Sequence, residues 1–204
     1  MLYKLVGIWY DGVMANETKK LNVYRLKNKY DEYFRGCGID IGCGGDVLSK
    51  MIFKNIDSVV VYDNQFDVSN DAMYCGNIGD GVFDFVYSSH CLEHMDNPYE
   101  AFSNWLRICK VGGYVIVAIP HEIFYEKCKW PSVYNGDHKT SWTLEFASNL
   151  PKSINVIDFL KHFDDNIELI RCNSIVSDFD FNRFDEDQTR ADAICQIEFV
   201  VRKK

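Results

Sequence analysis

The sequence lacks long apolar runs, and this absence disfavours a membrane protein. None of the runs in its 204 residues approaches the roughly 20 residues that a helix needs to span a bilayer. Tyr10, Asp11 and Asn16 interrupt the N-terminal segment, which therefore lacks the apolar core of a signal peptide. We expect a soluble protein of the cytoplasm with no membrane partner.

Paired cysteine motifs are also missing. The chain contains eight cysteines, but they are scattered, mostly in apolar segments, and no Cys-x-x-Cys occurs. Without clustered thiolates there is no ligand set for an iron–sulfur cluster, which excludes radical chemistry. We expect reduced thiols that pack in the core.

The chain has no excess of basic residues. Its 22 lysines and arginines stand against 30 acidic residues, which gives a formal net charge of −8. Nucleic acids and anionic membranes both favour a basic surface, so we expect neither as the main partner and a small molecule instead. The length and the 47% hydrophobic content suffice for one sizeable core, so we expect residues 1–204 to form a single domain.

A glycine-rich turn is the strongest local signal. The apolar residues 37–41 predict a buried strand, and residues 47–54 predict a helix directly after the turn. Gly42 and Gly44 allow a sharp turn and a close approach of a ligand to the backbone, because they carry no Cβ. Acidic residues flank the turn, Asp40 among them, and they disfavour a pyrophosphate. The turn therefore favours a cation that also carries hydroxyls and an amine.

A second strand ends in another acid. Residues 58–62 are rich in β-branched side chains, and Asp63 follows at their C-terminal end. Open α/β sheets bind ligands outside the carboxyl ends of their strands, so we expect Asp63 beside the vicinal hydroxyls of a ribose. Only seven residues separate Asp63 from Asp71, which is too few for a helix of about 11 residues. The helix after this strand is therefore reduced or absent, and the third strand is in doubt.

The glycine turn and a later segment together resemble the class I S-adenosylmethionine-dependent methyltransferases. Asp40, Gly42 and Gly44 match the first motif of this family, an acid followed by two glycines at alternate positions. The apolar run at 82–87 and the Ser-His-x-Leu-Glu-His segment after it are similar to the fourth strand and following loop of the branch that methylates small molecules. The resemblance implies a Rossmann-like, doubly wound α/β fold with a mostly parallel seven-stranded sheet and an antiparallel C-terminal hairpin.

The remaining elements are expected in the order that this fold requires. We expect helices at 17–34, 98–109 and 154–163, the last capped by Ser153, a fifth strand at 114–119, and hairpin strands at 167–175 and 193–202. In the resembled family an N-terminal helical segment covers the cofactor, and residues 1–35 are expected to do so here.

The resemblance also implies residues that hold S-adenosylmethionine, the cofactor of the family. They are Asp40, Gly42, Gly44, Asp63, Asn64, Asp71, Ala72, Ser88 and, on the N-terminal helix, Arg25. Asp63 would hold the ribose, Asp71 and Ala72 the adenine, and Arg25 the methionine carboxylate.

Residues 120–150 are expected to cover the substrate. The stretch follows the fifth strand, mixes aromatic residues with histidine, asparagine and lysine, and has no clean period. The same rings could instead fill a second small core. The residues expected at the acceptor are Ser89, Trp130, Tyr134 and Asn135, and the candidates for a catalytic base are His90, His121 and His138. The acceptor would be a small polar molecule, such as a sugar or a sugar nucleotide, methylated on oxygen or nitrogen.

Other classes of function stay open at this point. A similar glycine turn occurs in NAD-binding oxidoreductases, although Val47 stands where their third glycine would be. A non-catalytic nucleoside-binding module is a second alternative, because the helix after Asp63 is missing. His90, Glu93 and His94 also match the His-x-x-Glu-His pattern of certain zinc peptidases, but a strand precedes them and a proline follows. No long helix can carry that pattern here, so we expect no metal site.

Overall fold

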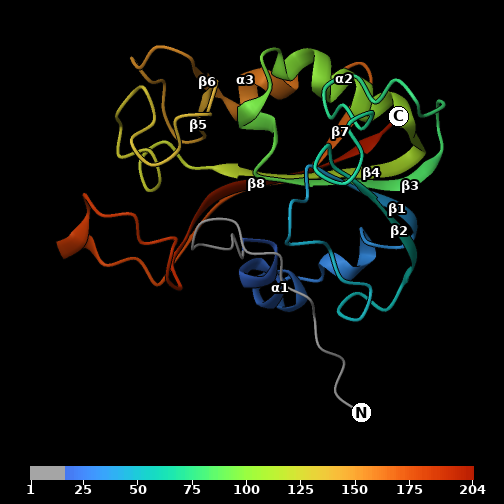
Figure 1. The fold of residues 1–204 in the computed structure, drawn as a ribbon, viewed down its shortest axis with the longest axis horizontal. Coiled ribbons are helices and arrows are strands. Elements are labelled where there is room, and N and C mark those ends of the chain that lie inside the picture. Colours follow the sequence, from blue (N-terminus) through green and yellow to red (C-terminus); the bar gives the residue numbers. More distant parts are fainter. Residues whose placement is uncertain (1–16) are drawn as a thin grey trace.

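The centre of the protein is a mixed sheet with helices on both faces (Figure 1). The computed structural model describes residues 17–204, so the first part of the expected N-terminal cover, residues 1–16, lies outside the described residues. The strands of the central sheet are β1 (Gly36–Ile41), β2 (Ile56–Tyr62), β3 (Phe83–Ser89), β4 (Cys109–Pro120), β7 (Ile167–Ser177) and β8 (Ile194–Lys203). A second, two-stranded sheet pairs β5 (Ser141–Thr143) with β6 (Ser153–Asn155). The helices are α1 (Glu17–Lys27), α2 (Pro98–Ile108), α3 (Val156–Lys161) and the short 3₁₀ helices η1 (Tyr30–Glu32), η2 (Leu92–His94) and η3 (Phe181–Arg183).

The central sheet confirms the expected topology with one strand fewer. The strand order is β2-β1-β3-β4-β8-β7, and the first four strands are parallel. β8 runs antiparallel to both β4 and β7, which confirms the C-terminal hairpin. The sheet has six strands where seven were expected. The connection at 64–70 forms only turns, as its length required, and β2 is left at the edge of the sheet.

α2 and α3 cover one face of the sheet, and α1 covers the other (Figure 1). α2 begins at Pro98 as expected, and the side chain of Asn97 caps it by accepting a hydrogen bond from the N–H of Glu100 at 3.3 Å. Its buried residues are Pro98, Ala101, Phe102, Trp105, Leu106 and Ile108. This apolar face closes the larger core of the protein between the sheet and the helix layer.

α3 is shorter than the helix expected at 154–163 and has a different cap. Ser153 lies in β6, and its hydroxyl donates a hydrogen bond to Glu122. Asn155 caps the helix instead, because its side-chain oxygen accepts a hydrogen bond from the N–H of Ile157 at 2.9 Å. The pairing of β6 with β5 therefore takes the residues that would have formed the first turn.

α1 is held to the sheet mainly by polar contacts, since three of its four buried residues are polar. The helix ends at Lys27, and η1 follows where a continuous helix was expected. Arg25 is fully buried and donates to Glu198 on β8 through Nε at 2.8 Å and also through Nη2. Its Nη1 donates to the hydroxyl of Tyr87 on β3 at 2.9 Å. One buried guanidinium thus ties α1 to two strands.

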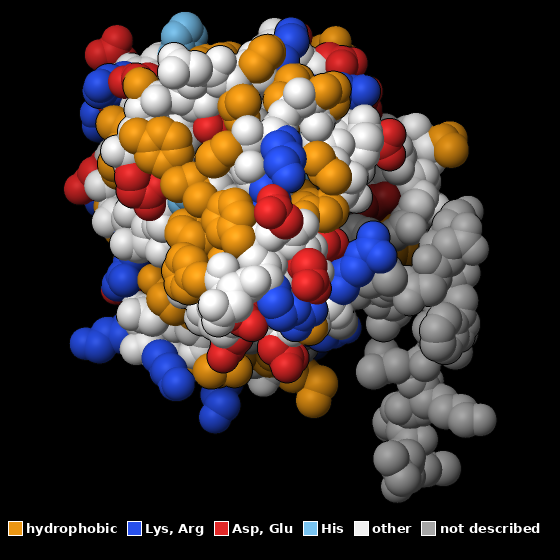
Figure 2. All heavy atoms as spheres, turned by 90° about the vertical axis from the view of Figure 1, so that its left-hand side faces the viewer, with side chains coloured by type: hydrophobic (Ala, Val, Ile, Leu, Met, Phe, Trp, Pro, Cys, Tyr) orange, Lys and Arg blue, Asp and Glu red, His pale blue; other side chains and the backbone are white. Residues whose placement is uncertain are grey.

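Residues 120–150 and the loop between β7 and β8 lie together at one end of the molecule, on the left in Figure 1. The two segments are joined at Asp185, whose carbonyl accepts from Tyr134 and whose carboxylate lies 3.0 Å from Nζ of Lys129. Figure 2 shows hydrophobic side chains gathered on this end among charged ones. Trp142, in contrast, is fully buried in the larger core. Some rings of the segment therefore fill the core, whereas others stay near the surface.

In residues 17–204 no helix is long and apolar enough to cross a membrane.

Removing one partner of the buried Arg25–Glu198 pair should destabilise the fold strongly. Glu198→Ala would leave the guanidinium buried without a carboxylate, and the loss of one partner of a buried pair costs about 3–5 kcal/mol. Replacing both residues, Arg25→Met with Glu198→Leu, should restore most of the lost stability. Chemical denaturation followed by circular dichroism measures the free energy of unfolding.

The more exposed pair of Arg171 and Glu32, 3.9 Å apart, provides the matched control. Glu32→Ala should cost less than about 1 kcal/mol, because water screens the pair. A cost for Glu198→Ala as small as that for Glu32→Ala would show that the buried pair does not hold α1.

Candidate active site

The turn after β1 has the geometry of a ligand-binding loop. Gly42 and Gly44 have φ angles of +67° and +52°, a region that other residues rarely adopt. A Cβ on Gly42 would lie 2.3 Å from Sγ of Cys91, so this glycine lets the turn after β1 pack against the turn after β3. A Cβ on Gly44 would have its nearest neighbour at 4.0 Å, and one on Gly45 would have none within 4 Å. The second half of the turn therefore faces open space.

The helix expected at 47–54 is absent, and this prediction is wrong. Turns and irregular backbone occupy the segment. The N–H of Leu48 donates to Oδ2 of Asp40 at 2.7 Å, and Asp46 accepts from the N–H of Thr18 at 2.8 Å, at the start of α1. Asp46 thus caps a helix from another part of the chain, and the glycine turn offers no helix N-terminus to a phosphate.

Asp40 is a fully buried carboxyl group at the base of the turn. Its Oδ2 accepts from the N–H of Leu48, whereas Oδ1 has no hydrogen-bond partner among the described residues. Burial raises the pKa of Asp40 to about 7, although the Leu48 hydrogen bond and the charge of Arg25 act in the opposite direction. A cationic ligand beside this group would favour its ionised form.

Asp63 contacts the glycine turn, because β1 and β2 are neighbours in the sheet. Its Oδ2 accepts from the N–H of Gly44 and its Oδ1 from the N–H of Gln65, both at 2.9 Å. A carboxylate has about four acceptor positions, so Asp63 keeps capacity for hydroxyl groups. Asn64, next to it, is exposed.

Asp71 and Ala72 lie in the turns that replace the third strand. Oδ1 of Asp71 accepts from the N–H groups of Met73 at 2.9 Å and Tyr74 at 3.2 Å, so the side chain stabilises a turn. The carbonyl of Ala72 accepts from Nε1 of Trp105 at 2.7 Å, which fastens this turn to α2. The turn is thus held in a fixed position next to the helix layer.

The two serines at the end of β3 have different surroundings. Ser88 is fully buried and donates to the carbonyl of Ile41 at 3.0 Å, which links β3 to β1. The hydroxyl of Ser89 is shielded from solvent and has no hydrogen-bond partner among the described residues. His90 follows with a φ of +53°, so the chain turns sharply at this point.

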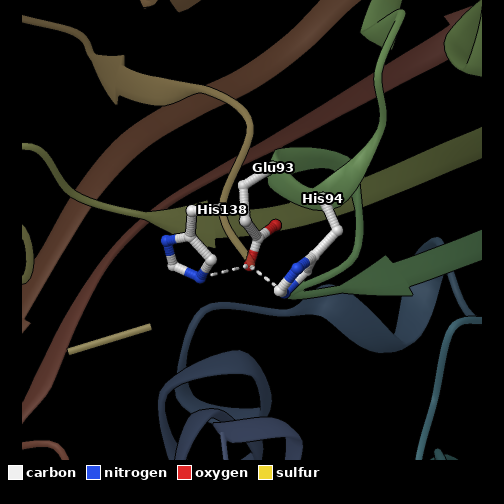
Figure 3. A group of neighbouring side chains, drawn as sticks. All are labelled: Glu93, His94 and His138. Atoms are coloured by element: carbon white, nitrogen blue, oxygen red, sulfur yellow. Dashed lines mark ion pairs between the residues drawn. The ribbon is translucent and has the colours of Figure 1, made fainter. Parts of the chain in front are cut away.

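A buried carboxylate lies among three histidines directly after β3. Glu93, in η2, has no exposed surface, and neither of its carboxylate oxygens has a hydrogen-bond partner within the described chain. Its Oε1 lies 3.6 Å from Nδ1 of His90, 3.8 Å from Nε2 of His94 and 3.9 Å from Nε2 of His138. Figure 3 shows the rings of His94 and His138 converging on this oxygen. Residues 120–150 thus contribute a side chain to the end of β3.

Two of these histidines have a further partner on the far side of the ring. Nδ1 of His138 lies 2.6 Å from Oε1 of the buried Glu126. Nε2 of His90 lies 2.6 Å from Oε1 of Gln196 on β8. Burial lowers the pKa of His138, but the hydrogen bond to Glu126 and the charge of Glu93 outweigh it, so the pKa is raised. Both rings are therefore held in defined orientations.

His121 belongs to a different network from the other two base candidates. Its Nδ1 accepts from the N–H of Ile123 at 3.1 Å, so Nε2 carries the proton and lies 3.2 Å from Glu145 and 3.1 Å from Ser174. The ring is fully buried, and burial lowers the pKa of His121. Both of its nitrogens are engaged within the protein, which leaves neither available to an acceptor.

The expected acceptor residues of the 120–150 segment are half-buried. Tyr134 uses its hydroxyl to bond the carbonyl of Asp185, and the side-chain oxygen of Asn135 accepts from the N–H of Asp137 at 3.1 Å. Trp130 is likewise partly exposed. The polar groups of this segment therefore fix the loop, while the aromatic faces are available for contacts.

Arg25 departs most clearly from its expected role. Its guanidinium is fully buried in the ion pair with Glu198, so the structure provides an internal carboxylate where the cofactor carboxylate was expected. Separating such a pair would leave a buried charge, which is costly.

Three buried residues next to the base candidates were not identified from the sequence as site residues. In the sequence, Glu93 was recognised only as part of a peptidase pattern. Its acidic side chain between two histidines could have indicated a site residue. Glu126 and Gln196 carry no local pattern. Gln196 reaches His90 only because β8 pairs antiparallel with β4, which places it opposite Pro120.

Comparisons with known proteins find a matching domain and similar folds. Residues 39–117 match the family model of a methyltransferase domain. A protein from Listeria monocytogenes described as an S-adenosylmethionine-dependent methyltransferase has 12% identity and a TM-score of 0.61, over 94% of this chain and 100% of that one. The N-methyltransferase NodS from Bradyrhizobium japonicum, in complex with S-adenosyl-L-homocysteine, has 10% identity and a TM-score of 0.56, over 91% of this chain and 86% of that one. No curated protein sequence matches this chain.

The domain match covers the middle of the chain, and the shared fold covers nearly all of it. At such low identities the solved structures show the fold, and the match at residues 39–117 covers both the glycine turn and the end of β3. Residues 39–117 therefore form a methyltransferase domain, and the chain has the fold of proteins that use S-adenosylmethionine. The resemblance found in the sequence is thereby confirmed.

The raised pKa of Asp40 predicts a pH-dependent stability difference between the wild type and Asp40→Asn. The folded protein keeps this proton up to about pH 7, whereas the unfolded chain loses it near the ordinary pKa of 3.8. Ionisation of Asp40 therefore costs the wild type stability as the pH rises through this window, by at most about 4 kcal/mol, and asparagine does not titrate. Thermal unfolding at a series of pH values measures the difference.

The melting temperature of the wild type should fall relative to that of Asp40→Asn from about pH 4 to pH 7 and then level off. Asparagine keeps an acceptor for the N–H of Leu48, so the turn itself is preserved. Parallel curves for the two proteins would show that Asp40 is ionised throughout.

Proposed function

We propose that the protein transfers the methyl group of S-adenosylmethionine to an oxygen or nitrogen of a small polar acceptor, such as a sugar or a sugar nucleotide. The observation that carries this proposal is the open space over Gly44 and Gly45, next to which the carboxylate of Asp63 accepts from the N–H of Gly44. The net charge of −8 supports an acceptor other than nucleic acid.

The residues around the turn fit the chemical groups of the cofactor. Asp63 offers carboxylate oxygens to ribose hydroxyls, and Gly44 lets the backbone approach them because no Cβ intervenes. Asp40 provides a buried negative charge for the cationic part of the molecule. Asn64, Asp71, Ala72 and Ser88 are proposed to complete this side of the site. Arg25 is proposed to support it indirectly, since its charge favours the ionised form of Asp40.

The acceptor is proposed to bind between the end of β3 and residues 120–150. The hydroxyl of Ser89 there has no hydrogen-bond partner in the part of the chain that the structure describes, and His138 brings the 120–150 segment to Glu93. Trp130, with Tyr134 and Asn135, would form the outer wall, where aromatic faces stack on the apolar surface of a sugar or base. In this arrangement residues 120–150 are the substrate cover of one methyltransferase domain, and residues 17–35 are the described part of the cofactor cover. We place this activity in the cytoplasm.

The chain contributes alignment, exclusion of water and a proton acceptor to the reaction. Bound S-adenosylmethionine supplies the methyl carbon, which forms a bond to the acceptor atom as the carbon–sulfur bond breaks and its electron pair stays on sulfur. Holding the two reactants in line is worth roughly 7–11 kcal/mol of the barrier. The proton of the acceptor passes to His90, whose side chain is 21% exposed, whereas that of His138 is 2% exposed and His121 is fully buried. His90 is therefore the base candidate that an acceptor can reach.

Changing Asp63→Asn should weaken the binding of S-adenosylmethionine and S-adenosylhomocysteine by the same factor. The amide keeps one acceptor for the N–H of Gly44 but loses the charge, and a charged hydrogen bond is worth about 1.5–3 kcal/mol, or roughly 10- to 100-fold in affinity. Isothermal titration calorimetry with both ligands measures it. The control is Asp67→Asn, which alters a similar turn-stabilising carboxylate, bonded to Ser69, at an exposed position. Equal affinities for Asp63→Asn and the control would remove Asp63 from the cofactor site.

Incubating the protein with a cell metabolite extract and deuterated-methyl S-adenosylmethionine should label a small polar compound. Mass spectrometry identifies it by the mass increment of the labelled methyl group, and a reaction without protein is the control.

Trp130→Ala should lower the rate of labelling and leave cofactor affinity unchanged, because the residue is proposed to lie on the acceptor side. Labelling of bulk protein or RNA in place of a metabolite would contradict the proposed acceptor class.

A further inference from the structure

Within residues 17–204, neither carboxylate oxygen of Glu93 accepts a hydrogen bond. The carboxylate has no exposed surface and makes no hydrogen bond, and unpaired buried carboxylates are strongly unfavourable. The groups that approach its Oε1 are ring nitrogens of His90, His94 and His138, at 3.6 to 3.9 Å. These separations are too long for hydrogen bonds, but they suit atoms that share a common neighbour.

The partners of the rings define which nitrogens face Glu93 with a lone pair. Glu126 accepts from Nδ1 of His138, and Gln196 accepts from Nε2 of His90, so these nitrogens carry the hydrogens of the neutral rings. The nitrogens turned toward Glu93 are then acceptors. Electron-rich atoms of the carboxylate and two imidazoles would repel one another unless a cation lies between them.

We propose that Glu93, His94 and His138 bind a divalent transition-metal ion. Their three ligand atoms lie within 4.8 Å of one another, and a modest contraction brings them to the distances of about 2.0–2.2 Å that zinc requires from nitrogen and oxygen ligands. Two imidazoles and one carboxylate favour Zn²⁺ or a similar ion over Mg²⁺, which prefers oxygen ligands alone. Three protein ligands leave a fourth position open, as in catalytic zinc sites.

The outer partners of the ligands support this assignment. A metal-bound histidine commonly donates its other N–H to a carboxylate, which fixes the ring and increases its basicity, and Glu126 does this for His138. The half-buried His94, with 30% of its side chain exposed, provides a route for the ion from solvent. The site thus has ligands, an outer carboxylate and an entrance.

This inference revises the expectation that the segment after β3 holds no metal. That expectation considered His90 and His94 as ligands on one long helix, and η2 is indeed only three residues long. In the proposed ligand set, Glu93 takes the place of His90, and the third ligand is His138 from residues 120–150. The third ligand comes from a loop, which helix periodicity in the sequence does not reveal.

The position of the ion connects it with methyl transfer, a step that depends on the proposed function. Cys91 packs against Gly42 of the cofactor turn, and Glu93 follows two residues later. An ion at Glu93 therefore lies beside the place where the acceptor is proposed to bind, and its open position would take an acceptor oxygen and favour the loss of its proton. Metal binding itself does not depend on this role.

Zinc binding to the full-length protein tests the site without any assay of activity. The protein is stripped with a chelator and titrated with Zn²⁺ in calorimetry, and Co²⁺ is used as a spectroscopic probe of ligand type. Cys37→Ser and Cys128→Ser are introduced throughout, because these two exposed thiols could bind zinc by themselves. We expect one equivalent per chain, no competition from Mg²⁺, and a Co²⁺ spectrum without thiolate bands.

Variants of the ligands should show a graded loss of affinity. Glu126→Gln should weaken Zn²⁺ about 10- to 100-fold, as expected for an outer partner. Glu93→Gln, His94→Gln and His138→Gln should each weaken it further. His162→Gln, at an exposed histidine beyond α3, should change nothing. Circular dichroism and size-exclusion chromatography confirm that each variant is folded, and His94→Gln, at the most exposed ligand, keeps the test valid if a buried variant unfolds.

The outcomes separate the metal site from the proposed function. Less than a tenth of an equivalent of Zn²⁺, or equal affinity in the wild type, Glu93→Gln and His94→Gln, would overturn the inference and leave a network of protonated histidines around Glu93. Stoichiometric zinc in a protein that binds no S-adenosylhomocysteine would support the metal site and contradict the proposed methyl transfer. A protein that binds S-adenosylhomocysteine normally but binds no zinc would contradict the metal site and leave the proposed methyl transfer intact.

Discussion

The close packing of Gly42 against Cys91 is the contact on which the site depends. A Cβ at Gly42 would lie 2.3 Å from Sγ of Cys91, so only glycine lets the turns after β1 and β3 meet. The parallel arrangement of β1 and β3 brings both turns to one edge of the sheet, and the hydrogen bond from Ser88 to Ile41 holds the strand ends together. One turn carries the residues that suit the cofactor, and the other leads into the cluster around Glu93. The reaction proposed here needs these two groups to be neighbours.

Buried charges distinguish this protein from a simple α/β scaffold. Arg25 and Glu198 neutralise each other and hold α1, so their role is structural. Asp40 and Glu93 have no such partner, and each keeps at least one oxygen without a hydrogen bond within the described chain. Groups of this kind are unstable unless something else supplies the charge or the proton. The proposed cofactor site would supply a positive charge to Asp40, and the proposed metal site would supply one to Glu93.

Much of the fold could be predicted because its signals are local. The strands were predicted from apolar runs, and α2 was predicted from an amphipathic repeat that begins with Asn-Pro. The loss of the helix after β2 was predicted because too few residues follow this strand. The helix expected at 47–54 was wrong, because Asp40 and Asp46 bind backbone N–H groups of Leu48 and of α1, a competition that periodicity does not show. The cap of α3 was misassigned for a similar reason, since β6 exists only through its pairing with β5.

The candidate site was predictable on the cofactor side and much less so on the acceptor side. Asp40, Gly44 and Asp63 come from consecutive strand ends, so the topology alone places them together. The cluster around Glu93 needs His138 from an irregular segment of 120–150 and Gln196 from the last strand. No sequence spacing encodes these contacts, because they form only when the loop folds back over the sheet.

A crystal structure of the protein with S-adenosylhomocysteine and Zn²⁺ tests the central claim most directly. The account predicts the ribose at Asp63, the backbone of Gly44 against the ligand, and the sulfur directed toward a zinc ion held by Glu93, His94 and His138. A ligand bound at a distance from the glycine turn, or one whose sulfur points away from Glu93, would contradict it.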